Sequence, residues 1–179
     1  IDDCLDMVRI ELEKAMEKKE FADEVRSKTL AYSGEILMSH MMEYILQSQG
    51  IKSKVVGLDN WPIITDSNIE STNFLASESS KKIEFLERLL NENQVMTIGG
   101  FIGRTTDGIV TTYERGGSDR TAADLGILLH KKFDVKIDLE KDSSVVSADP
   151  KIVKDGLTEV HSISYNEARL AGMFGMNIL

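Results

Sequence analysis

The sequence is poor in cysteine and proline, with one Cys and two Pro among 179 residues. The single cysteine, Cys4, cannot form an internal disulfide, which is typical of proteins in a reducing compartment such as the cytoplasm. Cys4 also lies among Asp2, Asp3 and Asp6, and such an acidic neighbourhood disfavours the thiolate that a catalytic cysteine requires. We therefore predict a cytoplasmic protein in which Cys4 is a structural residue of a helix.

Long apolar runs and clustered cations are also missing. No stretch approaches the roughly 20 apolar residues of a membrane-spanning helix, so no membrane partner is predicted. The net charge is −9, from 21 Lys and Arg against 30 Asp and Glu. Nucleic-acid binding depends on clustered cations, so nucleic acid is not an expected partner either. The three histidines are far apart and have no ligand spacing with the cysteine, which predicts no metal site in the protein itself.

Apolar residues recur every three or four positions in two stretches, which predicts amphipathic helices at residues 5–16 and 35–49. Further helices are predicted at residues 79–91 and, after Ser118, at 119–131. The expected apolar faces of the first two are Leu5, Val8, Leu12 and Met16, and Ile36, Leu37, Met41, Tyr44 and Ile45. A capping-box spacing begins a last helix at Ser164. Short β-prone runs predict strands at residues 53–58, 63–64, 95–98 and 134–139. At this length we expect one domain, with an α/β fold in which helices cover a mainly parallel sheet as a three-layer αβα sandwich.

The most informative segment is 99–126, GGFIGRTTDGIVTTYERGGSDRTAADLG. A buried strand runs into its first glycines, which indicates that backbone approaches a ligand or another segment closely there. The second glycine turn ends in Ser118 and Asp119, where a helix is predicted to begin with Ser118 as its N-cap. Helix N-termini attract anions, and Arg115 adds a guanidinium beside this one. Local physics leaves two interpretations open, an anion site or only a turn followed by a cap.

The same segment resembles the aspartokinases of the amino acid kinase family, through Gly-Phe-Ile-Gly, then Thr-Thr, then Arg-Gly-Gly-Ser-Asp before a helix of small residues. Further pieces of the family pattern flank it in the same order. They are Gly34-Glu35, the stretch 148–153, and the stretch 163–168 followed by Phe174-Gly175. The resemblance therefore extends from about Ser33 to the last residue, and it implies one amino acid kinase domain, residues 1–179, truncated at both ends.

The resemblance implies ATP-dependent phosphorylation of the side-chain carboxylate of L-aspartate, with Mg²⁺ bridging the phosphates. This reaction is the entry step to lysine, threonine and methionine. The implied aspartate-binding residues are Glu35, Phe101, Arg115 and Ser118. The implied catalytic residue is Asp119, and the implied nucleotide-binding residues are Gly116, Gly117 and Lys151. A homo-oligomer is also expected. Two of these residues have structural alternatives: core packing for Phe101, and a solvated first turn of a helix for Glu35.

Parts of the family pattern are missing or changed. The motif Lys-Phe-Gly-Gly-Thr, whose lysine offsets phosphate charge, is not found in these 179 residues. On the nucleotide side Val146 replaces an aromatic residue, Lys151 an arginine and Asn177 a lysine, so the sequence supports ATP binding less than aspartate binding. We expect residues 1–179 alone to fold at least partly and to show little turnover. Two alternatives stay open: a non-catalytic aspartokinase-like binding or regulatory subunit, and a kinase for glutamate, acetylglutamate or UMP.

Overall fold

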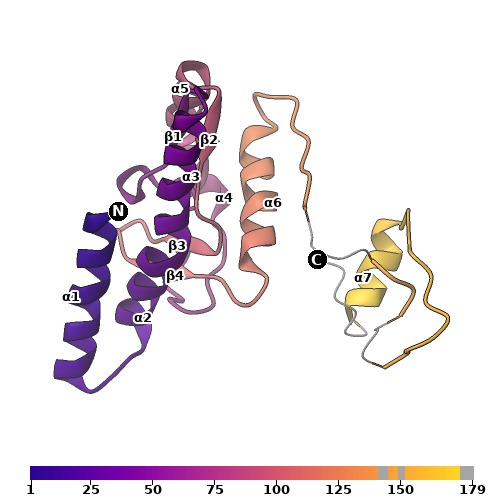
Figure 1. The fold of residues 1–179 in the computed structure, drawn as a ribbon, viewed down its shortest axis with the longest axis horizontal. Helices are drawn as coiled ribbons and strands as arrows, with labels where there is room; N and C mark the ends of the chain where they lie inside the picture. The colour runs from indigo at the N-terminus through magenta and orange to yellow at the C-terminus, as the bar shows by residue number, and fades with distance from the viewer. Residues whose placement is uncertain (141–144, 149–151, 174–179) are drawn as a thin grey trace. The chain divides into compact units, whose positions relative to one another are not determined.

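The computed structural model describes residues 1–140, 145–148 and 152–173 (Figure 1). By their internal contacts the residues group into two units, Ile1–Ile137 and Asp138–Leu179. The first unit contains both glycine turns of the segment 99–126. The expectation of a single domain stays a prediction, and the two units are described separately below.

The N-terminal third of the first unit is helical. It contains α1 (Asp2–Lys18), α2 (Asp23–Leu30), one π-helical turn η1 (Ala31–Glu35) and α3 (Ile36–Ser48), with α2, η1 and α3 following one another without a break. The predicted helices at 5–16 and 35–49 are confirmed as α1 and α3. Neither α2 nor the π-turn was predicted, because residues 23–35 carry no regular apolar repeat.

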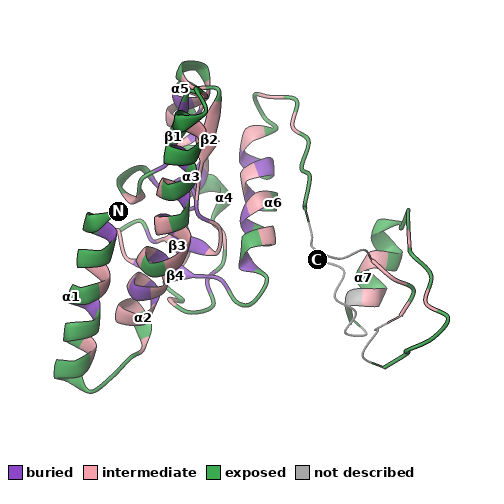
Figure 2. Ribbon diagram, viewed as in Figure 1, coloured by how far each residue is buried: buried purple, intermediate pink, exposed green. Residues whose placement is uncertain are grey.

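The predicted apolar face of α1 is wrong, and that of α3 is right only at its start, where Ile36 is 5% exposed and Leu37 packs against the core. Leu5, Leu12 and Met16 are 52%, 43% and 76% exposed, whereas the buried positions of α1 are Cys4 and Glu11. In α3 the buried positions are Ile36, Ser39 and Glu43, and much of the remaining helix is exposed (Figure 2). Polar side chains thus occupy several of the buried positions of these helices, and some of them are hydrogen-bonded there. The Ser39 hydroxyl, for example, donates a hydrogen bond of 2.7 Å to the Glu35 carbonyl.

A parallel ladder joins β1 (Ser53–Val55) to β2 (Val95–Thr97), with Ser53 opposite Val95. Helix α3 packs on both strands and α5 (Ile83–Glu92) packs on β2, following the short helix α4 (Ala76–Ser80). The 3₁₀ turn η2 (Leu58–Asn60) comes after β1. Strands β1 and β2 confirm the strands predicted within 53–58 and 95–98. In place of the one helix predicted at 79–91, the structure has the two helices α4 and α5.

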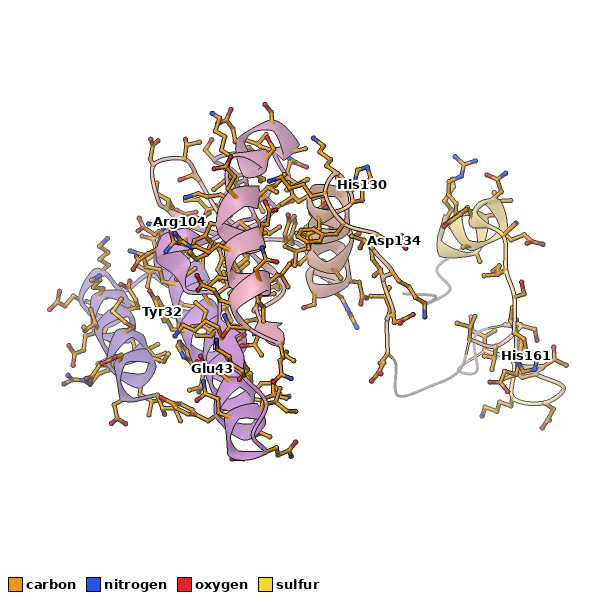
Figure 3. The ribbon with its side chains drawn as sticks, turned by 90° about the horizontal axis from the view of Figure 1, so that it is seen from above. Tyr32, Glu43, Arg104, His130, Asp134 and His161 are labelled. Carbon is orange, nitrogen blue, oxygen red and sulfur yellow. The ribbon has the colours of Figure 1, made fainter. Side chains whose placement is uncertain are left out.

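A hairpin of β3 (Ile102–Arg104) and β4 (Val110–Thr112) continues the chain, and Ile64 makes a parallel bridge to Arg104. Arg104, labelled in Figure 3, donates from its guanidinium to the carbonyls of Leu58 (2.6 Å) and Gly108 (3.2 Å). These bonds tie the tip of the hairpin to η2. Trp61 is 1% exposed and donates its indole N–H to the Ile102 carbonyl at 3.0 Å, which fixes β3 against the core.

Helix α6 (Gly117–Leu129) packs on β3, close to the predicted range 119–131. The strand predicted at 134–139 is wrong, because residues 134–140 contain no strand. Instead the Ile137 side chain lies against Gly126 of α6, where an added Cβ would come within 2.4 Å of Ile137 Cδ1. Val135 and Ile137 alternate with polar residues as in a strand, but they pack along α6 instead of pairing in a sheet.

In the second unit, α7 (Tyr165–Met173) begins with the predicted capping box. The Ser164 backbone N–H donates to the Glu167 carboxylate at 2.8 Å, and the Glu167 N–H donates back to the Ser164 hydroxyl at 3.3 Å. An antiparallel bridge pairs Val146 with Glu159. Within 1–140, 145–148 and 152–173, no helix has the length and apolar character needed to cross a bilayer.

Candidate active site

Gly99 and Gly100, which connect β2 to β3, bring two distant elements together. A Cβ on Gly99 would lie 2.9 Å from Glu35 Cβ, and a Cβ on Gly100 would lie 2.9 Å from Ser118 Cα, Cβ and Oγ. Only glycine allows this approach without displacing the neighbouring helix. The first glycine turn therefore lies between the π-turn that ends at Glu35 and the first turn of α6.

Glu35 is half-buried at the end of η1, and its carboxylate accepts a hydrogen bond from the Gly100 N–H. Burial raises the pKa of Glu35 above its ordinary value, and the bond from Gly100 opposes that rise. The Ser39 hydroxyl donates to the Glu35 carbonyl at 2.7 Å, so the backbone of this residue is also held. Short π-helical segments occur frequently at functional sites, and here the segment positions a carboxylate.

Phe101 adopts φ 68°, a left-handed conformation that non-glycine residues rarely take. Its N–H donates to the Thr121 hydroxyl at 3.0 Å, and its carbonyl accepts from the Tyr113 N–H at 2.9 Å. Its ring lies against Gly117, where an added Cβ would be 2.9 Å away. The surrounding structure thus holds Phe101 in a strained conformation, as is common at ligand sites, while its ring also packs against the core.

The second glycine turn leads from β4 into α6. Gly116 has φ 84° and is the N-cap residue, so the prediction that Ser118 caps this helix is wrong. Glycine takes this position because the chain must turn through the left-handed region immediately before the helix. Arg115 and Ser118 are exposed and Asp119 is half-buried. The Gly117 N–H donates to the Glu114 carbonyl at 3.0 Å, so this turn must open before that N–H can contact a phosphate.

A buried polar pair beneath this turn was not predicted. The Tyr113 hydroxyl donates to Asp124 Oδ2 at 2.7 Å, and the two residues are 1% and 6% exposed. The Arg120 guanidinium lies 4.9 Å from the centre of the Tyr113 ring. The one signal in the sequence is an aspartate within the small and apolar run Ala-Ala-Asp-Leu-Gly of α6, and that signal says nothing about its partner.

The structure thus brings together seven of the eight predicted site residues. Glu35 contacts the first glycine turn and Phe101 follows it, whereas the other five lie in the second turn and the first turn of α6: Arg115, Gly116, Gly117, Ser118 and Asp119. Lys151, predicted to bind nucleotide, lies outside the described residues. Among the described residues, no group of three or more His, Cys, Asp or Glu side chains is arranged to hold a metal ion.

The chain matches the model of the amino acid kinase family over residues 5–179. It belongs to that family. Among curated relatives it is similar to bifunctional aspartokinase/homoserine dehydrogenase 2 of Arabidopsis thaliana, with 33% identity over 160 residues, 88% of this chain and 17% of that protein. It is also similar to the aspartokinase of Rickettsia felis, with 31% identity over 148 residues, 82% of this chain and 35% of that protein.

Among solved structures, E. coli aspartokinase III in complex with aspartate and ADP is similar over the whole chain, with a TM-score of 0.81 and 25% identity. The match covers 38% of that protein, so this chain spans less than half the length of the relatives it matches. The amino acid kinase fold, with helices on both sides of a mainly parallel sheet, is therefore confirmed.

Proposed function

We propose that this chain forms part of an enzyme that transfers the terminal phosphoryl group of ATP to the side-chain carboxylate of L-aspartate. The product would be 4-phospho-L-aspartate, the entry to lysine, threonine and methionine biosynthesis. The observation that carries the proposal is the double contact of the Gly99-Gly100 turn with Glu35 and with Ser118. This contact places a carboxylate, a hydroxyl and the N-terminus of a helix around one point of the chain.

Each group at this point suits one part of aspartate. The Glu35 carboxylate suits the ammonium group, because the two carry opposite charge. Arg115 suits a carboxylate, because its planar guanidinium can donate two parallel hydrogen bonds. Ser118, in the first turn of α6, adds a hydroxyl donor beside the positive end of the helix dipole. Phe101, held in its left-handed conformation next to Gly117, would supply the apolar side of the aspartate site.

Phosphoryl transfer requires mainly positioning and charge stabilisation from the protein. A carboxylate oxygen of aspartate would bond to the terminal phosphorus as the bond to ADP breaks. Asp119 would lie beside the reacting phosphate, where it orients the cations that offset the developing charge. Gly116, Gly117 and Lys151 would contact the nucleotide. Mg²⁺, when bound with the nucleotide, would supply further charge neutralisation. A cytoplasmic homo-oligomer remains part of the proposal, supported by the single buried cysteine for the compartment.

Arg115→Ala tests the pocket by binding alone. A bidentate ion pair to a carboxylate contributes about 1.5–3 kcal/mol, so aspartate affinity should fall about 10- to 100-fold. Affinity for ATP should change much less, and Arg115→Lys should restore aspartate binding only in part. Arg9→Ala, at an exposed arginine of α1, is the matched control. Calorimetric titration of both ligands measures the effect, and unchanged aspartate affinity in Arg115→Ala would contradict the pocket.

Asp119→Asn tests catalysis. In the natural polypeptide that carries residues 1–179, a hydroxamate assay for aspartyl phosphate should show strongly reduced turnover with nearly intact aspartate binding. The reason is that a contact made in the transition state affects rate more than ground-state affinity. A wild-type protein that binds aspartate and never transfers phosphate would establish the non-catalytic binding subunit instead. Transfer to glutamate, acetylglutamate or UMP in preference to aspartate would establish another kinase of this family.

A further inference from the structure

Tyr113 and Asp124 lie on either side of the turn that carries the proposed site. Tyr113 follows β4 directly, and Asp124 lies in the second turn of α6. Between them lie Arg115, the two glycines, Ser118 and Asp119. A hydrogen bond of 2.7 Å from the Tyr113 hydroxyl to Asp124 Oδ2 joins these two flanks.

The surroundings of this pair make its geometry rigid. Tyr113 and Asp124 are 1% and 6% exposed, so water cannot replace either partner without opening the core. The Tyr113 Cβ lies against Gly117, where an added Cβ would come within 2.5 Å of it. The Tyr113 N–H donates to the Phe101 carbonyl at 2.9 Å, which connects the pair to the first glycine turn.

The electrostatics favour the same arrangement. Burial raises the pKa of Tyr113, and the neighbouring Asp124 raises it further, so the hydroxyl stays a donor at neutral pH. Burial also raises the pKa of Asp124, and the bond from Tyr113 and the charge of Arg120 oppose that rise. Arg120 covers the outer side of the Tyr113 ring at 4.9 Å. The Asp124 carboxylate is thus stabilised by the hydrogen bond from Tyr113 and by the nearby charge of Arg120.

We propose that the hydrogen bond between Tyr113 and Asp124 sets the direction in which α6 leaves the second glycine turn. The pair would then consist of positioning residues for Ser118, Asp119 and the glycine N–H groups. Since the effect on catalysis rests on the proposed phosphoryl transfer, the pair would affect the rate of transfer more than the affinity for aspartate. A small misplacement of the groups around a transferring phosphoryl group costs rate, whereas the exposed Arg115 side chain can adjust to keep its carboxylate contact.

The test compares Tyr113→Phe, Asp124→Leu and Asp124→Asn in the natural polypeptide, with Ile127→Ala on the exposed side of α6 as control. Tyr113→Phe and Asp124→Leu remove the hydrogen bond, and both should lower kcat about tenfold or more while the KM for aspartate changes less than about threefold. Asp124→Asn keeps an acceptor oxygen for the Tyr113 hydroxyl and should restore most of the lost rate. The double variant Tyr113→Phe/Asp124→Leu should lose little more than either single variant.

Amide hydrogen exchange at Gly117 and Arg120, whose N–H groups donate to the carbonyls of Glu114 and Gly116 across the turn, supplies a readout that does not depend on activity. Exchange there should accelerate in Tyr113→Phe and Asp124→Leu and stay slow in Asp124→Asn and Ile127→Ala. If the wild-type protein transfers no phosphate, this exchange pattern still tests the role of the Tyr113–Asp124 hydrogen bond. In that case only the proposed function is refuted. If Tyr113→Phe does not fold, the comparison of Asp124→Asn with Asp124→Leu decides. Unchanged kcat and exchange in the variants without the bond, or equal losses in Asp124→Asn and Asp124→Leu, would overturn the proposal.

Discussion

Gly100→Ala should disturb the candidate site through a single added methyl group. The new Cβ would lie 2.9 Å from Cα, Cβ and Oγ of Ser118, whereas ordinary contacts of a Cβ begin at 3.4 Å. The first turn of α6 and the Gly99-Gly100 turn must therefore separate by about 0.5 Å, the difference between these two distances. Two of the three contacted atoms, Cα and Cβ, cannot move away by side-chain rotation.

The expected cost follows from this clash. Overpacking of a well-packed site costs about 1–3 kcal/mol in the free energy of unfolding. For a chain of this size, about 2 kcal/mol corresponds to a fall in Tm of roughly 4–8 °C. The same displacement lengthens the hydrogen bond from the Gly100 N–H to the Glu35 carboxylate. Aspartate affinity should therefore fall together with stability, although the substitution adds no polar group.

Gly57→Ala is the matched control. Gly57 has φ −76° and ψ 156°, and a Cβ there would meet nothing within 4 Å. This variant carries only the entropic effect of replacing glycine in the unfolded chain, about 0.4–1 kcal/mol in favour of folding. Thermal unfolding followed by circular dichroism, with calorimetric titration of aspartate, measures both variants. If Gly100→Ala matches Gly57→Ala in Tm and in aspartate affinity, the close approach of the two turns is refuted.

Two further predictions concern carboxylates. Burial raises the pKa of Glu35, so the charged form that would bind an ammonium group is lost at higher pH than for an ordinary glutamate. Aspartate affinity should fall between pH 7 and 5 in the wild type, and Glu35→Gln should bind about tenfold more weakly with little dependence on pH; parallel pH profiles in calorimetry would contradict this. Hydrogen bonds from the Asn73 side chain and from Asn68, Thr72 and the Asn73 backbone lower the pKa of Asp66 to about 2. Because the folded pKa lies below the unfolded value, this stabilisation is present above about pH 4 and lost as pH falls toward 2. Asp66→Ala should cost about 1 kcal/mol in urea unfolding at pH 7 and much less at pH 2.5, and an equal cost at both would refute the assignment.

Local patterns in the sequence predicted the elements whose structure depends on nearby residues. The period of the apolar residues predicted α1 and α3, the cap-like residues after the second glycine turn predicted α6, and the Ser164–Glu167 spacing predicted the start of α7. The order of the motifs in 99–126 indicated the family and the two turns of the candidate site. These features are local because helix periodicity, capping and glycine turns all act over a few residues.

Tertiary contacts decided the rest. Residues 134–139 have the alternation of a strand, yet Ile137 packs on Gly126 of α6. The buried side of α3 is set by its contact with β1 and β2, which favoured Ser39 and Glu43 over Met41 and Ile45. Glu35 and Ser118 meet through Gly99 and Gly100, and Tyr113 pairs with Asp124 across the second turn. No periodicity encodes such pairs, because their energy comes from side chains brought together only once the sheet and the helices have packed.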